Sequence, residues 1–274
     1  MFDYHMHSLY SGDIPEGKGS SVLQLCRTAI ERGFTEIAIT DHFDIDGIYY
    51  GAFPRLDIEG VYRDILNCRE LFSEKLNILF GIELGQACHM PKEAKYLLDR
   101  FPFDYVIGSV HTVRGLLDIS FLDLKHMDDN SILSLWDKYI EELKELVDWG
   151  YFCTLAHITY PYRYMKLAGR EKLLDLKSIG RAVFEDIMKE IIQKGISLEV
   201  NTSGLRQGVG ETLPGDDLIQ FYKELGGELI TVGSDAHNAR DLGADIKITV
   251  EKLKSFGFEY ITRYENRKPF MQKI

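Results

Sequence analysis

The sequence lacks most features that mark secreted, membrane-spanning or multidomain proteins. Only four cysteines occur in 274 residues, without a C-x-x-C pair, which favours reduced thiols over a disulfide framework or a thiolate zinc site. There is no run of about eighteen apolar residues, and the first residues lack the basic and apolar stretches of a signal peptide. With seven prolines there is also no linker-like tract. We therefore expect a single cytoplasmic domain over residues 1–274, with no membrane span.

Basic side chains are scarce relative to acidic ones. The chain has 32 Lys and Arg against 43 Asp and Glu, which gives a formal net charge of −11 at pH 7. Nucleic-acid backbones are bound by clustered Lys and Arg, so nucleic acid is not an expected partner. A small phosphate ester is compatible with this charge, because a metal cluster attracts it locally. We expect a small-molecule partner and a monomer or small homo-oligomer.

Short apolar runs alternate with helical stretches along the whole chain. The predicted strands cover residues 2–5, 36–40, 77–82, 105–109, 152–156, 197–201 and 229–234. The predicted helices cover residues 21–32, 56–74, 130–149, 177–194 and 216–225, and a run at 256–262 is a candidate for an extra terminal strand. Repeated strand–helix units predict parallel pairing with right-handed crossovers. They favour a closed or nearly closed (β/α)7 barrel, with an open doubly wound sheet as the alternative.

Histidines and carboxylates gather at the ends of these predicted strands, where barrels carry their chemistry. Six of the eight histidines fall there. The strand-end residues are His5, His7 and Asp13, then Asp41 and His42, Glu83, His111, His157, and finally Asp235 and His237. Random placement would seldom produce this distribution, so the joint pattern predicts a metal site.

The residue types indicate which metals such a site would hold. Imidazole nitrogen together with carboxylate oxygen suits Zn²⁺, Mn²⁺ and Fe²⁺, whereas Ca²⁺ and Mg²⁺ sites are nearly all oxygen. His5 and His7 alternate along a strand, so both can face one side and bind one ion. Glu83 has two carboxylate oxygens and can bridge two metals. Two metals ~3.5–4 Å apart can hold a hydroxide and neutralise a transferring phosphoryl group.

Single parts of this pattern have simpler explanations. An isolated H-x-H or D-x-H is compatible with exposed or core histidines. Asp41 and Asp44 are equally expected as helix caps or as partners that orient ligands. His89 and His126 lie apart from the strand ends, and we expect them at the surface or at the edge of the substrate site rather than among the ligands.

The same segments resemble the motifs of the polymerase and histidinol phosphatase (PHP) superfamily. The matching motifs are H-x-H at residues 5–7 and the segments 40–42, 81–83, 108–111, 156–157 and 233–237. Residues 199–206, with the sequence EVNTSGLR, are similar to the corresponding segment of the histidinol-phosphate phosphatase branch. The resemblance spans nearly the whole chain. It implies a distorted, TIM-like (β/α)7 barrel with a trinuclear metal site at the C-terminal ends of the strands.

The resemblance also implies the ligands of three divalent ions (Zn, Mn or Fe). The proposed sets are His5, His7, Glu83 and Asp235 for the first ion, Glu83, His111 and His157 for the second, and Asp13, His42 and His237 for the third. Some members of the superfamily have His in place of Asp13, and the acid makes the third site richer in oxygen.

The activity implied by the resemblance is hydrolysis of L-histidinol phosphate to L-histidinol and phosphate, a step of histidine biosynthesis. A metal-bridging hydroxide would attack phosphorus without a strong protein base, with Glu83 and Asp235 holding the metals. Arg206 would contact the phosphoryl oxygens, since its fork suits them better than a lysine does. Arg163 is a second candidate for this contact and Arg114 a third.

Other substrate contacts are less defined by the sequence. Ser203 and Asp44 are candidates for binding substrate. The proton for the leaving alcohol would come from Asp41, Asp44 or a metal-bound water. The walls around the alcohol would draw on acidic and aromatic side chains after the second strand, namely Asp44, Asp46, Tyr49 and Tyr50.

Two other functions are compatible with the same residues. One is a phosphatase of this superfamily that acts on another small ester, such as a nucleotide or a phosphopeptide. The other is a metal-binding module without turnover, like the PHP domains appended to polymerases. The filled ligand positions and the lack of an attached partner domain argue against the second function.

Overall fold

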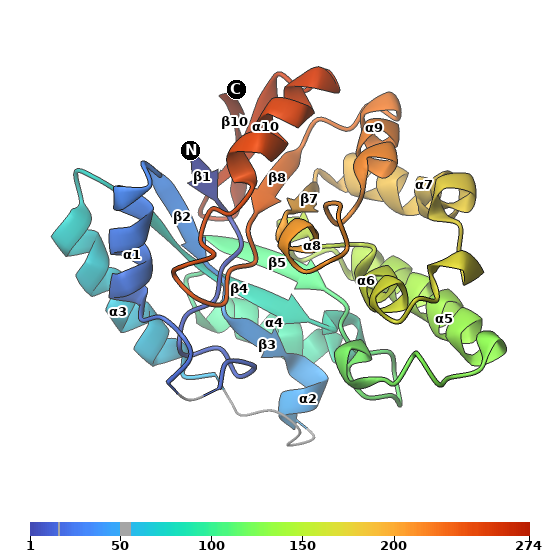
Figure 1. Ribbon diagram of the computed structural model, residues 1–274. Helices are drawn as coiled ribbons and strands as arrows, with labels where there is room; N and C mark the ends of the chain where they lie inside the picture. Colours follow the sequence, from blue (N-terminus) through green and yellow to red (C-terminus); the bar gives the residue numbers. More distant parts are fainter. Residues whose placement is uncertain (16, 50–55) are drawn as a thin grey trace.

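The strands form a nearly closed parallel barrel. The computed structural model describes residues 1–15, 17–49 and 56–274. Its barrel strands are β1 Phe2–Asp3, β2 Glu36–Ile39, β4 Asn77–Gly85, β5 Tyr105–Ser109, β6 Thr154–Leu155, β7 Ser197–Asn201 and β8 Ile230–Gly233, paired in that order and parallel (Figure 1). The barrel closes where the segment after β1 meets β8. There Tyr4 N–H donates to the Val232 carbonyl (3.1 Å) and His7 N–H to the Ala236 carbonyl (2.8 Å). The predicted (β/α)7 barrel is confirmed.

A short extra strand, β3 (His42–Asp44), continues the path of β2 along β4. The pairing of β2 with β4 ends at Ile39, and β3 resumes it with His42 opposite Glu83. Between them, the Thr40 side chain and backbone bond to Met6: Met6 N–H donates to Thr40 Oγ1 (3.1 Å), and Thr40 N–H donates to the Met6 carbonyl (2.9 Å). This break was not predicted, and it places His42 directly beside Glu83.

Helices cover the outside of the barrel (Figure 1). The predicted ones are present within two residues of their expected bounds, as α1 Val22–Glu31, α3 Ile58–Phe72, α5 Asp129–Trp149, α7 Leu176–Lys194 and α9 Asp216–Glu224. The structure adds α2 Ile45–Tyr49, α4 Pro91–Arg100, α6 Tyr160–Leu167, α8 Ser203–Arg206 and α10 Ile246–Ser255, and the 3₁₀ turns η1 Ala87–His89, η2 Ile119–Phe121 and η3 Glu171–Leu173. Helix α1 shows why the prediction succeeds: Ser21 and Gln24 form a capping box, and its apolar side is buried.

The C-terminal residues form a hairpin rather than a further barrel strand. The extra terminal strand expected at 256–262 is present but begins later, at Tyr260, and it pairs with the chain end as β9 (Tyr260–Glu265) and β10 (Lys268–Lys273). Asn266 and Arg267 both have positive φ (49° and 61°), as a two-residue hairpin turn requires. This hairpin meets the N-terminal ends of the barrel strands: Ile230 N–H donates to Thr262 Oγ1 (2.9 Å).

Two further expectations concern the thiols and the membrane. All four cysteines are free, three of them buried, as expected for reduced thiols. Among the described residues, no helix combines the length and apolarity needed to cross a membrane.

Candidate metal centre

The buried carboxylate of Glu83 lies at the centre of the strand-end histidines. Its Oε1 is 3.1 Å from His111 Nε2 and 3.0 Å from His157 Nε2. Its Oε2 is 3.0 Å from His5 Nε2, 3.1 Å from His42 Nδ1 and 3.6 Å from His7 Nε2. One carboxylate therefore faces separate groups of imidazole nitrogens with its two oxygens, which is the arrangement expected of a bridging ligand.

Asp235 supplies a second buried carboxylate. Its Oδ1 lies 3.3 Å from His7 Nε2, 3.8 Å from His5 Nε2 and 3.6 Å from His237 Nδ1. Burial alone would raise the pKa of both Glu83 and Asp235, but the surrounding histidines hold these pKa values well below their usual range. Both side chains are therefore charged and available as metal ligands.

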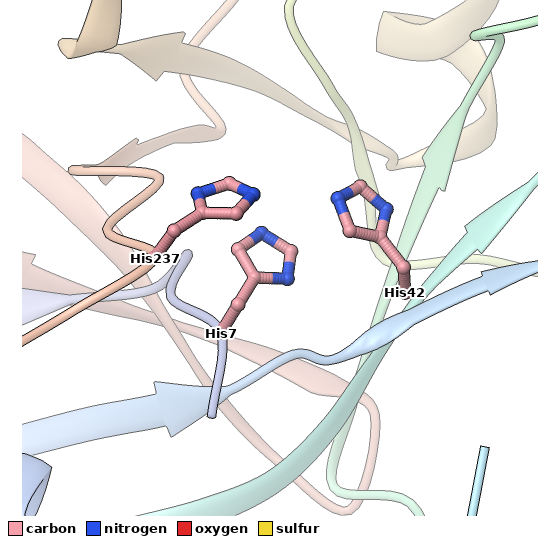
Figure 2. A group of neighbouring side chains, drawn as sticks. All are labelled: His7, His42 and His237. Carbon is pink, nitrogen blue, oxygen red and sulfur yellow. The ribbon is translucent and has the colours of Figure 1, made fainter. Parts of the chain in front are cut away.

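A third group gathers His7, His42 and His237, whose rings point toward one another from three different parts of the chain (Figure 2). The His7 ring centroid is 4.3 Å from that of His42 and 4.3 Å from that of His237. Asp13 closes this group, since its Oδ2 is 2.7 Å from His237 Nε2 and 3.8 Å from His42 Nε2. This group is more exposed than Glu83, because the side chains of Asp13 and His237 are 38% and 33% exposed.

The donor atoms fit divalent transition metals. Four groups of His, Glu and Asp, including His5–His7–Asp235 and His42–Glu83–His111, each bring their donor atoms within 4.8 Å of one another. His7 Nε2 and His42 Nδ1 are buried and form no hydrogen bond among the described residues, although carboxylate oxygens of Asp235 and Glu83 lie 3.3 and 3.1 Å away. Unpaired buried polar atoms are costly, and coordination of an ion would satisfy them. Several metal positions are therefore available around Glu83 and Asp235.

A layer of acidic residues orients the histidines. Glu199 Oε1 is 2.6 Å from His5 Nδ1, and Glu199 Oε2 accepts from the His157 backbone N–H (3.0 Å). Asp44 Oδ1 is 2.8 Å from His111 Nδ1. These contacts leave the Nε2 atoms of His5 and His111 facing Glu83, as in carboxylate–histidine–metal arrangements. Glu199 was not singled out from the sequence, although its place two residues before Asn201 on β7 predicts that the two share one side of the strand.

The backbone is strained at two of these positions. His157 has φ of 26° and Asp235 has φ of 53°, a region that residues other than glycine seldom adopt. Such strain is typical of functional sites, where surrounding contacts maintain it. At Asp235 the contacts are made by Arg206, whose Nη1 and Nη2 donate to the carbonyls of Ser234 (2.6 Å) and Asp235 (2.7 Å).

A cavity of about 450 Å³ opens beside the histidines and carboxylates. Its lining consists of Gly12, Asp13, His42, Asp44, His111, Asp118, Ser120, Phe121, His157, Tyr160, Arg163, Tyr164, Leu167, Gln207, Asp235 and His237. Within this lining Arg163 is buried; its Nη2 donates to Ser203 Oγ (2.7 Å) and lies 3.7 Å from Asp235 Oδ2. Its Nε is buried and has no hydrogen-bond partner within the described part of the chain.

The other residues predicted to contact phosphate are not part of the described cavity lining. Arg206 is absent from the described lining of this cavity, because its guanidinium faces the backbone at residues 234 and 235. Ser203 is fully buried and donates to Asn201 Oδ1 (2.6 Å). Arg114 is exposed at the surface and pairs with Glu145 (2.6 Å). Of these candidates, Arg163 is the one that the structure places at the cavity wall.

Asp41 is buried and accepts from Ser8 N–H (2.5 Å) and Oγ (2.7 Å), which makes it an orienting residue of the loop after β1. The side chain of Tyr49 and all of Tyr50 lie outside the described residues.

The two histidines outside the cluster differ from each other. His126 lies at the surface, as expected, with its side chain 74% exposed. The expectation that His89 lies at the surface or the substrate edge was wrong: its side chain is only 6% exposed and bridges Asp46 (2.9 Å) and Glu142 (2.7 Å). Its ring therefore joins α2 to α5.

Comparisons with known proteins agree with this geometry. The family model described as "PHP domain" matches residues 3–203. A protein of Clostridium acetobutylicum named "Probable histidinol-phosphatase" is 29% identical over 248 residues, covering 90% of both chains. A Lactococcus lactis protein named "Histidinol-phosphatase" is 27% identical, covering 97% of this chain and 95% of its own. The fold is similar to the crystal structure of histidinol phosphate phosphatase from L. lactis in complex with zinc, L-histidinol and phosphate (TM-score 0.83, 24% identity, 98% of each chain covered).

Proposed function

The chain belongs to the PHP domain family, and we propose that it hydrolyses L-histidinol phosphate to L-histidinol and phosphate in histidine biosynthesis. Proteins similar over nearly the full length, from C. acetobutylicum and L. lactis, carry the name of this activity. The observation that supports it most directly is Glu83, whose two oxygens face different sets of histidines beside a cavity that also holds Arg163. This geometry suits phosphomonoester hydrolysis at a shared metal site.

The proposed site binds three divalent metal ions, which are Zn²⁺, Mn²⁺ or Fe²⁺. One set of ligands would be His5, His7, Glu83 and Asp235, a second Glu83, His111 and His157, and a third Asp13, His42 and His237. Bound divalent ions lower the pKa of a coordinated water and neutralise charge on a phosphoryl group. The similar L. lactis structure contains zinc, which favours Zn²⁺ as one occupant.

The protein side chains would position the ester. Arg163 lies at the cavity wall, and its guanidinium would bind phosphoryl oxygens. Arg206 is proposed to act chiefly on Asp235, through the carbonyl that it holds; direct contact with phosphate stays a prediction. Asp44 would act through the His111 ring that it orients, and Ser203 through the Arg163 guanidinium.

The catalytic unit proposed is the whole of residues 1–274. The family match ends at residue 203, but Asp235 and His237 follow β8, which completes the barrel beside β1. A fragment that stopped at residue 203 would lack both ligands.

The test is phosphate release by the purified protein after reconstitution with Mn²⁺, Zn²⁺ or Fe²⁺. The substrates are L-histidinol phosphate and a panel of nucleotides and sugar phosphates, at matched concentrations. We expect the highest kcat/KM for L-histidinol phosphate. A preference for nucleotides would show that the protein acts on another phosphate ester. No phosphate release from any substrate, with metal bound, would identify a metal-binding module without turnover.

A further inference from the structure

Asp118 is the acidic residue of the described cavity lining that lies apart from the histidines. The other acids in that lining, Asp13, Asp44 and Asp235, each contact a histidine. Asp118 follows β5 in the segment that returns toward His111, and two contacts fix its place. It forms an isolated bridge with Thr112, and the next residue, Ile119, donates its N–H to the His111 carbonyl (3.0 Å). A negative charge is thus held near the cluster without belonging to it.

The hydrogen bonds of Asp118 use one of its two carboxylate oxygens. Oδ1 accepts from the Ser120 N–H (2.7 Å) and from the Tyr160 hydroxyl (3.2 Å). In the part of the chain that the structure describes, Oδ2 accepts no hydrogen bond, and no Lys, Arg or His nitrogen lies within 4.0 Å of the carboxylate. The side chain is half-buried in the cavity wall. Its charge is therefore available to a cation inside the cavity.

Tyr160 connects this carboxylate to the phosphate side of the cavity. Its ring centroid lies 4.9 Å from that of His111 and 5.3 Å from that of His157, and the Arg163 guanidinium lies over the same ring at 5.5 Å. One tyrosine side chain thus touches the metal histidines, the candidate phosphate-binding cation and Asp118. A molecule that carries an anionic phosphate and, a few bonds away, an ammonium group matches this order of charges.

We infer that Asp118 is a specificity-determining residue, which binds the ammonium group on the alcohol side of the phosphate ester. This inference rests on the proposed function, because it assumes that the cavity holds a phosphomonoester. It restricts the preferred substrates to esters of amino alcohols. At the rim, Phe121 exposes 67% of its surface on the same segment and offers an aromatic face to a flat heterocycle on the same substrate.

Asp118→Asn removes the charge and retains the fold. The amide oxygen of Asn can still accept from the Ser120 N–H and the Tyr160 hydroxyl, so the start of η2 is preserved. The matched control is Asp123→Asn, on the same segment, where the carboxylate pairs with the exposed His126 outside the described cavity lining. Asp118→Glu is the variant that restores the charge. Thermal unfolding of each variant checks that folding is unchanged.

The measurements are steady-state kinetics with three phosphate esters and direct binding of one product. The esters are L-histidinol phosphate, O-phosphoethanolamine, which carries an ammonium, and p-nitrophenyl phosphate, which does not. For Asp118→Asn we expect KM for the two cationic esters to rise about tenfold, with kcat and all p-nitrophenyl phosphate kinetics near those of wild type. Calorimetry should show a similar loss of affinity for L-histidinol. Asp118→Glu should recover part of the selectivity, and Asp123→Asn should behave as wild type.

The outcomes separate this inference from the proposed function. If wild type prefers L-histidinol phosphate and Asp118→Asn keeps the same preference and the same affinity for L-histidinol, Asp118 is only a cap of η2 and the inference is overturned. If wild type shows no preference for L-histidinol phosphate, the proposed function fails. In that case the ratio of O-phosphoethanolamine to p-nitrophenyl phosphate turnover, compared between wild type and Asp118→Asn, still decides whether Asp118 selects cations.

Discussion

Replacement of Arg206 by Met distinguishes two roles for this side chain. The sequence predicts a phosphate contact, whereas the structure shows the guanidinium bonded to the carbonyls of Ser234 and Asp235 at 2.6 and 2.7 Å. Both residues are almost fully buried, at 0% and 5% exposure, so their carbonyls would lose partners that water does not readily replace. Asp235 also has positive φ, a conformation that depends on its contacts. The structural role therefore predicts a loss of stability as well as of activity.

The expected magnitude follows from the two bonds. Hydrogen bonds from a charged donor contribute ~1.5 kcal/mol or more each, so Arg206→Met should lower the free energy of unfolding by roughly 3 kcal/mol. For a chain of 274 residues, that corresponds to a decrease in Tm of about 5 °C. Because Asp235 is a proposed ligand, metal content should fall in parallel.

The assays are thermal unfolding, elemental analysis and phosphate release, all on metal-reconstituted protein. Arg240→Met is the matched control, since Arg240 lies nearby with its side chain 85% exposed. Its Tm and metal content should match those of wild type. If Arg206→Met raises KM for phosphate esters but leaves Tm and metal content unchanged, the guanidinium acts on substrate and the structural explanation is refuted.

Three further predictions follow from other contacts. Glu83→Gln should lower metal content and reduce phosphate release at least about a hundredfold, because a neutral amide cannot bridge the metals beside both sets of histidines. The exposed Glu145→Gln is the control. Wild-type metal content and turnover in Glu83→Gln would exclude a shared ligand. Arg163→Lys should raise KM for phosphate esters about tenfold with metal retained, since the ammonium lacks the guanidinium fork. Steady-state kinetics and elemental analysis test this prediction. An unchanged KM would show that Arg163 does not bind phosphate. Burial would lower the pKa of His89, but its bonds to Asp46 and Glu142 outweigh this effect and raise that pKa from 6.5 to about 9. The charged form therefore stabilises the fold below pH 6.5, and this stabilisation, about 2 kcal/mol after allowance for solvent screening, is lost as pH rises from 6.5 through 9. Urea unfolding at several pH values should show a difference between wild type and His89→Gln that shrinks over this range, whereas a constant difference would contradict the linkage; the exposed His126→Gln supplies the baseline.

Much of the candidate metal centre was predictable because its residues follow a simple rule of position. In a parallel barrel the C-terminal ends of all strands meet at one end, so residues far apart in sequence converge there. His5, His111 and His157 could therefore be grouped with Glu83 from their places after predicted strands. The family expected from these motifs is confirmed by the match over residues 3–203.

What the sequence did not predict depends on contacts made across the fold. The orienting role of Glu199 requires the distance from β7 to His5, which no local pattern contains. The direction of the Arg206 side chain depends on the backbone that follows β8, and a motif match cannot show that its guanidinium faces carbonyls. His89 was assigned to the surface because its burial depends on carboxylates from α5 and from the segment after β3.

The closure of the barrel has a consequence for the order in which the chain can fold during synthesis. The first strand made, β1, has β2 as one neighbour and the segment around Val232 as the other. Asp3 accepts hydrogen bonds from Ser234 and from the Gly243 N–H, and Arg263 of the final hairpin pairs with Glu36. A nascent chain therefore cannot close its barrel until the segment around Val232 has left the ribosome. His5 and His7 meet Asp235 only at that stage, so the candidate metal centre is assembled late in folding.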